Sequence, residues 1–76
     1  SAFGFAQDLG QVKNDIDAER FDTAKKTLKT LIKSNPDNGK LFFYLEMDHE
    51  LLLLNNTNQH ERHLLKTKSV ECFQLR

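Results

Sequence analysis

The chain has little cysteine, little glycine and no tryptophan, which limits the kinds of site that it can build. Its 76 residues include one cysteine, three glycines and no tryptophan. Because Cys72 is alone, an internal disulfide and a cysteine-based zinc cluster are excluded. No glycine-rich phosphate loop, dinucleotide fingerprint or serine-centred elbow is present. Cys72 lies between Glu71 and Phe73, a setting that favours a structural thiol over a nucleophile. We therefore expect no catalytic residue, no cofactor and no metal.

An excess of charge of one sign is also missing. Eleven basic and eleven acidic residues cancel, so no net field draws the chain toward nucleic acid or an anionic membrane. The longest unbroken apolar run is Leu51–Leu54, far short of the roughly 18 residues of a membrane span. We therefore expect neither a nucleic-acid partner nor a membrane span.

Residues 1–7 are small and apolar, and charge begins at Asp8. This stretch resembles the end of a secretory signal peptide that lacks its basic start and most of its apolar core. Two interpretations stay open: a signal remnant, or an N-terminal arm that forms an ordinary first helical turn. The first would make the protein exported or periplasmic, and the second is equally compatible with a cytoplasmic location.

Residues 8–76 are predicted to form a single all-α domain of about four helices in two hairpins, 8–36 and 37–76. In the first hairpin, apolar residues at helical spacing predict a helix from about residue 5 to residue 17. Gly10 inside it would be tolerable if a neighbouring helix packed close to it. A second, cleaner stripe predicts a helix over about 20–34, which ends before Pro36.

The second hairpin has weaker periodicity. Asp37 or Asn38 can cap a third helix, and Asn58 with Glu61 forms a capping-box-like pair before a fourth. The third helix has more than one apolar face, and the stripe of the fourth is interrupted by Lys68 and Ser69. The expected apolar positions are Leu41, Phe42, Leu45, His49 and Leu52 in the third helix and Leu64, Leu65, Cys72, Phe73 and Leu75 in the fourth.

The stretch Arg20-Phe21-Asp22-Thr23-Ala24, followed by Leu28, Leu31-Ile32 and Asn35-Pro36-Asp37-Asn38, resembles the second helix of a tetratricopeptide repeat. An aromatic residue, a small alanine three residues later and a closing proline stand at the spacing of that family. Ala24 would let two helices approach closely, and Phe21 would fill the base of the hairpin. The match is strong over residues 20–38 and poor after Glu46, which occupies a position where the family has a small residue.

The resemblance implies a non-catalytic scaffold for protein–protein interaction made of antiparallel helical hairpins. In that family the first helices of successive repeats form the ligand groove. The residues carried over to such a groove are Gln11, Lys13, Asn14, Phe43, Glu46 and Glu50.

Two alternatives remain. About three repeats are usually needed for a stable array, so the chain is either part of a longer array or a small homo-oligomer. In the second case the interface is expected on Leu51, Leu52, Leu53 and Leu54. A weaker hypothesis is a metal-responsive protein that uses His49, His60 and His63, two of which are spaced i, i+3 on one helix.

Overall fold

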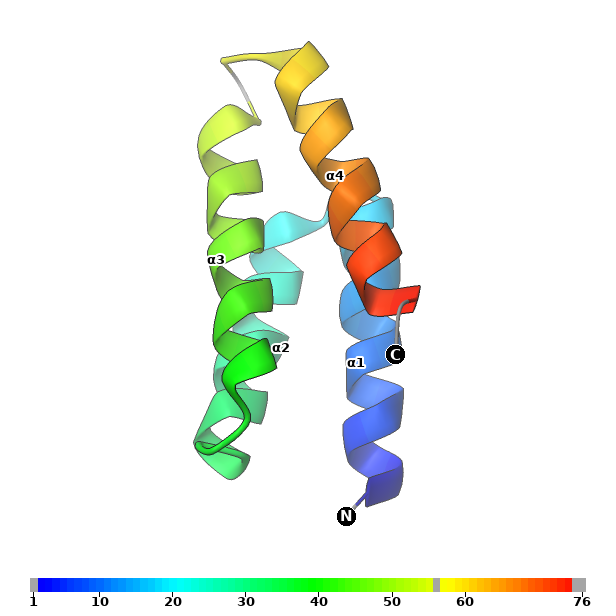
Figure 1. Cartoon of the computed structure of the whole chain (residues 1–76), viewed down its shortest axis with the longest axis vertical. Helices are drawn as coiled ribbons and strands as arrows, with labels where there is room; N and C mark the ends of the chain where they lie inside the picture. Colours follow the sequence, from blue (N-terminus) through cyan, green and yellow to red (C-terminus); the bar gives the residue numbers. More distant parts are fainter. Residues whose placement is uncertain (1, 56, 75–76) are drawn as a thin grey trace.

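The structure is a computed structural model that describes residues 2–55 and 57–74. The described chain contains four helices, α1 (Ala2–Asp17), α2 (Phe21–Ser34), α3 (Gly39–Leu54) and α4 (Gln59–Gln74). They run alternately up and down along one long axis (Figure 1). The predicted all-α fold of about four helices is therefore confirmed. The first helix begins three residues earlier than expected, so residues 2–7 form its first turns.

The helix ends follow the local signals in the sequence. The Asn38 side chain accepts a hydrogen bond from the Lys40 amide at 3.2 Å, so Asn38 rather than Asp37 caps α3. The Asn58 side chain accepts one from the Glu61 amide at 3.1 Å, which supplies half of the expected capping box. These caps satisfy amides that would otherwise lack a partner in the first turn of each helix.

The core uses the same spacing on α2 and α3. Four residues of each helix are buried at intervals of three, four and three positions: Phe21, Ala24, Leu28 and Leu31 on α2, and Leu41, Tyr44, Asp48 and Leu51 on α3. Because the two helices are antiparallel neighbours, this spacing sets Ala24 at the level of Asp48. The small Ala24 side chain allows α2 and α3 to lie close together in that layer.

The burial of α3 differs from the expected stripe. Phe42 and His49 are exposed, whereas Tyr44, Asp48 and Leu51 are buried. The buried positions 44, 48 and 51 each lie one residue before the predicted positions 45, 49 and 52, so a different face of the helix is buried. With apolar residues on several faces, hydrophobic periodicity does not select one of them. Packing of α3 against both α2 and α4 determines which face is buried. This arrangement places the Asp48 carboxyl group in the core, which is unfavourable.

Two smaller expectations also change. Among the described residues, nothing lies within 4 Å of the position that a Cβ atom of residue 10 would occupy, so none of the described parts of the other helices packs closely against Gly10. On α4, Leu64 is exposed and Ser69 is buried, while Leu65, Cys72 and Phe73 are partly buried. Leu75 lies outside the described residues.

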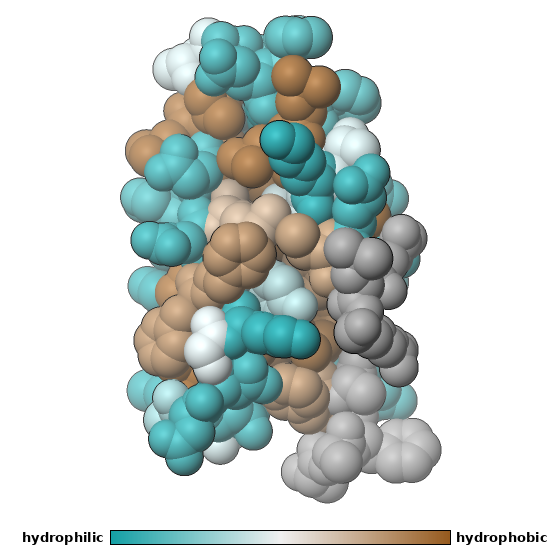
Figure 2. All heavy atoms as spheres, viewed as in Figure 1, coloured by the Kyte–Doolittle hydropathy of each residue, from teal (hydrophilic) through white to brown (hydrophobic). Residues whose placement is uncertain are grey.

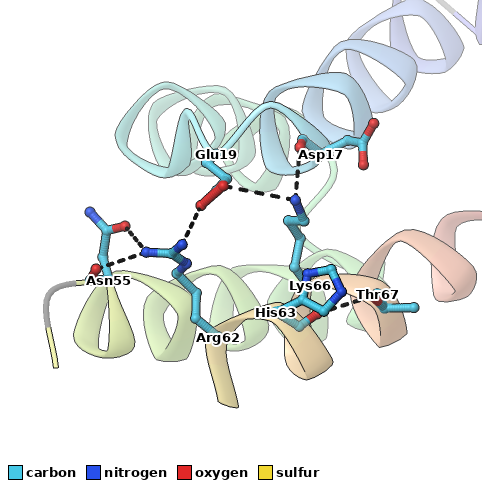
Figure 3. A network of polar contacts seen from close by, with 7 residues as sticks. All are labelled: Asp17, Glu19, Asn55, Arg62, His63, Lys66 and Thr67. Atoms are coloured by element: carbon cyan, nitrogen blue, oxygen red, sulfur yellow. Dashed lines mark hydrogen bonds and ion pairs between the residues drawn. The ribbon is translucent and has the colours of Figure 1, made fainter. Parts of the chain in front are cut away.

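The four helices close into a ring, in which α1 packs against α2 and α4, and α3 packs against the same two helices. At one end of the four-helix bundle, ion pairs of Glu19 connect the α1–α2 turn to α4 (Figure 3). Its carboxylate lies 3.0 Å from Nη2 of Arg62 and 3.9 Å from Nζ of Lys66. Arg62 also donates to the Asn55 carbonyl at 2.9 Å, and Lys66 donates to the Asp17 carbonyl at 3.3 Å. Glu19 adopts a positive φ of 64°, an uncommon conformation for a residue other than glycine.

Among the described residues, no helix has both the length and the apolar character that crossing a membrane requires.

Candidate protein-interaction surface

Three of the four large exposed apolar side chains of the described residues lie on α3. Phe42 and Phe43 each keep 50% of their surface exposed. In Figure 2, hydrophobic side chains gather along α3 and between α3 and α4, with hydrophilic side chains at the margins. Single exposed apolar residues are ordinary, but neighbouring half-exposed aromatic rings are typical of interaction sites.

A shallow depression surrounds these two rings. We call it the α3 groove, and its lining residues are Lys25, Gly39, Phe42, Phe43, Leu45, Glu46 and His49. All but Lys25 belong to α3, and Lys25 comes from the adjacent α2. The groove therefore lies mainly on α3 and reaches α2 at Lys25.

The charged groups of the groove have both signs. Lys25 supplies a cation, Glu46 supplies a carboxylate one turn after Phe42, and His49 adds an imidazole almost one turn further on. A groove lined by aromatic side chains and by charges of both signs can recognise a protein segment by shape and by charge.

The structure brings together only some of the residues that the family resemblance indicated. Phe43 and Glu46 line the α3 groove, and Glu50 is exposed about one turn beyond Glu46. By contrast, α1 and α3 alternate with α2 and α4 around the ring. The α1 members therefore lie apart from this groove: Gln11 and Asn14 are exposed and Lys13 is half-buried.

Gln11 has a local role instead. Its amide donates to the Asp15 carboxylate at 3.0 Å. Asp15 is itself buried and is paired with Arg20 at 2.9 Å. These contacts fix the end of α1 to the start of α2.

The four leucines expected at an oligomer interface have different environments. Leu51 is fully buried in the core, Leu52 and Leu54 are half-buried, and Leu53 is 57% exposed. Consecutive helical residues point about 100° apart, so a run of four leucines cannot share one face. Within this run, Leu53 is the residue with most surface available to a partner.

The three histidines are not brought together. His60 and His63 are exposed on α4, whereas His49 lies in the α3 groove. Among the described residues, no group of three or more histidine, cysteine or acidic side chains is arranged to hold a metal ion.

A buried polar pair was missed by the sequence analysis. Asp48 and Ser69 are both 0% exposed, and within the described part of the chain neither the Asp48 carboxyl oxygens nor the Ser69 hydroxyl has a hydrogen-bond partner. The pKa of Asp48 is raised from 3.8 to about 7, mainly by burial and in part by nearby Asp22, while Lys25 acts in the opposite direction. The repeated spacing of α2 and α3 could have revealed that position 48 is buried. When the two helix sequences are aligned in chain order on their buried residues, Asp48 occupies the position of Leu28.

An aromatic pair fixes the register between α3 and α4. The rings of Tyr44 and Phe73 stack with centroids 4.2 Å apart. Burial raises the pKa of Tyr44, and the neighbouring Cys72 adds to this effect. One turn from this pair on each helix lie Asp48 and Ser69, so antiparallel packing sets the two unpartnered groups at the same level of the core.

Comparison with protein-family models, with curated proteins and with solved structures finds no match to this chain.

Proposed function

We propose that the chain is a non-catalytic protein-interaction module of the tetratricopeptide type, which binds a segment of a partner protein in the α3 groove. The observation that carries this proposal is the pair of half-exposed rings, Phe42 and Phe43, which line a groove that also has charges of both signs. Aromatic residues are enriched in the interfaces where proteins bind each other.

The family assignment is supported by the first hairpin. Phe21 and Ala24 are buried, as close packing in a repeat hairpin requires, and Pro36 lies in the turn between α2 and α3. Since α4 packs on both α1 and α3, the ligand surface that we propose is the outer face of α3 rather than a groove shared by α1 and α3.

The fitting ligand is a peptide with an apolar or aromatic anchor flanked by an acidic and a basic residue. The anchor would cover Phe42 and Phe43, the acidic group would face Lys25, and the basic group would face Glu46. Removing the two rings should weaken such a peptide by at least about tenfold, because buried aromatic anchors carry much of the binding free energy.

A random peptide library selected against the chain at about 1 µM tests this proposal. Enriched peptides should contain an apolar anchor and both charges, and Phe42→Ala with Phe43→Ala should abolish their binding. Leu64→Ala is the matched control, because Leu64 is also 50% exposed but lies on α4. Peptides that bind the double variant as well as the wild type would refute the proposal.

The alternative, a small homo-oligomer, keeps one supporting observation, the exposure of Leu53. Leu53 lies on the same helix as the α3 groove, so the two ideas can be tested on one surface.

A further inference from the structure

The outer face of α3 has an ordered pattern that extends beyond the groove. Phe42, Glu46, His49 and Leu53 are all exposed and follow one another at intervals of four, three and four residues. Residues at this spacing lie in one stripe along a helix. We call this set the α3 stripe, with an apolar residue at each end and two polar residues in the middle.

The α3 stripe is symmetric about its own centre. Phe42 and Leu53 are equally far from the point between Met47 and Asp48, and so are Glu46 and His49. If two copies of α3 lie antiparallel, Phe42 of each copy therefore faces Leu53 of the other. In the same register, each Glu46 faces a His49. Intervals of four and three also match the a and d positions through which paired helices interdigitate.

We propose that the partner of the α3 groove is a second copy of this chain, bound through antiparallel contact of the two α3 stripes across a twofold axis. This inference rests on the proposed function, since it names the occupant of the same surface. A twofold interface requires one patch that complements itself, and the order apolar, acidic, histidine, apolar meets this requirement.

Charge complementarity supports a second copy over an unrelated helix. Each interface would contain two Glu46–His49 contacts, with a hydrogen bond to a neutral imidazole or an ion pair with a protonated one. Lys25, in the same groove, adds a cation beside the carboxylate of the partner. Phe42 and Leu53 would cover each other at both ends, which removes two of the large exposed apolar side chains from water.

The interface is short. Leu53 lies eleven positions after Phe42, which corresponds to about 16 Å of helix. A contact of this length falls at the low end of interface sizes, where complexes are weak. We therefore expect a dimer that dissociates on dilution.

Sedimentation equilibrium between about 10 µM and about 1 mM provides the first measurement. The wild-type chain should shift from monomer to dimer across this range. Glu46→Lys and His49→Glu should each raise the dissociation constant by at least about tenfold, because the first places a cation opposite His49 and the second places two carboxylates opposite each other.

Restoration of pairing is the decisive step. The double variant Glu46→Lys/His49→Glu should dimerise again, since each introduced lysine faces an introduced glutamate. An equimolar mixture of the two single variants should also form a mixed dimer. Lys68→Glu, a charge reversal on the exposed part of α4, is the matched control and should leave the wild-type equilibrium unchanged. Circular dichroism should show that every variant is folded.

The results separate this inference from the proposed function. A wild-type chain that stays monomeric at about 1 mM overturns the second-copy inference, and the proposed function survives if peptide binding still depends on Phe42 and Phe43. A dimer that neither charge reversal weakens, or that the double variant does not restore, also overturns it. A third result is that no peptide binds in a way that depends on Phe42 and Phe43, while dimerisation still depends on Glu46 and His49. This result would refute the peptide ligand and leave the second-copy inference standing.

Discussion

Asp48 is the residue whose environment departs most from what its chemistry favours. A fully buried carboxyl group without a hydrogen bond is destabilising when it is ionised. Ala24 and Ser69 are at its level, and both are small. Of the charged groups on α2, Asp22 disfavours ionisation and Lys25 favours it. On α4, Lys66 is directed to Glu19 and to the Asp17 carbonyl instead.

The shift of this one group makes stability depend on pH. The folded chain holds the Asp48 proton with a pKa of about 7, compared with 3.8 as the ordinary value. Between these pH values the folded state binds more protons than the unfolded state, so the unfolding free energy falls as pH rises. The contribution of Asp48 to the unfolding free energy is largest below pH 3.8. This contribution is lost once the pH has risen above about 7.

The corresponding variant is Asp48→Asn, which resembles the protonated side chain. Relative to this variant, the wild type should lose about 2–3 kcal/mol between about pH 5 and about pH 8. Urea unfolding at several pH values measures this difference. Ser69→Ala is the control: it removes the neighbouring unpartnered hydroxyl and should keep the wild-type pH slope. A parallel pH profile for wild type and Asp48→Asn would contradict the assignment.

At the scale of single helices, α2 is specified most clearly and α3 least clearly. On α2, one apolar stripe coincides with its four buried residues. On α3, Phe42, Phe43 and Leu53 compete with Leu41, Tyr44 and Leu51 for the core, and the packed arrangement leaves the first three outside. The surplus of apolar residues on α3 is what provides an interaction surface.

In α1, Gly10 weakens the helix, and no close contact with another described residue requires a glycine there. It lies in the middle of α1, is exposed, and has open space where a Cβ atom would be. Gly10→Ala should therefore raise the unfolding free energy by about 0.5–1 kcal/mol, through better helix propensity and a less flexible unfolded chain. Thermal unfolding monitored by circular dichroism should show an increase of several degrees, on the order of 4–8 °C per kcal/mol.

Gly39→Ala provides the comparison for this substitution. Gly39 also has open space around it but is the first residue of α3, where helix propensity has less influence than in a helix interior. Its effect should be smaller than that of Gly10→Ala. A destabilised Gly10→Ala variant would indicate a close approach to α1 that the structure does not show.

For the whole molecule, closure of the ring depends on α4. Among the described residues of α4, the only fully buried side chain is Ser69, while its apolar residues are at most partly buried. The contacts of Glu19 with Arg62 and Lys66 therefore hold α4 at one end, and the Tyr44–Phe73 stack holds it toward the other.

Removal of the charge at Glu19 tests this closure. Glu19→Gln should lower the unfolding free energy by about 0.5–1 kcal/mol, as expected for a partly exposed ion pair. The loss should shrink at high salt, because screening weakens the wild-type contact. Asp17→Asn is a suitable control, since Lys66 contacts the backbone carbonyl of Asp17. Chemical unfolding at low and high salt compares both variants. A Glu19→Gln effect that is independent of salt would argue against the ion pairs.

Much of the fold could be predicted from the sequence because its signals are local. Pro36 marks the end of α2, Asn38 and Asn58 cap the helices that follow them, and the α2 stripe identifies its own core residues. Of the six candidate binding residues, Phe43 and Glu46 line the α3 groove and Glu50 is exposed close by. The positions of Gln11, Lys13 and Asn14 relative to them depend on how the helices are arranged in space.

The amino-acid sequence alone determined the helical class, most of the helix boundaries and the buried face of α2, since each follows from contacts within a few residues. Only the tertiary structure decided which face of α3 is buried, because that choice results from packing against α2 and α4 together. That choice places Asp48 in the core and leaves Phe42 and Phe43 at the surface. The candidate interaction site and the pH-dependent core group therefore have one cause, the rotation of α3 in the closed ring.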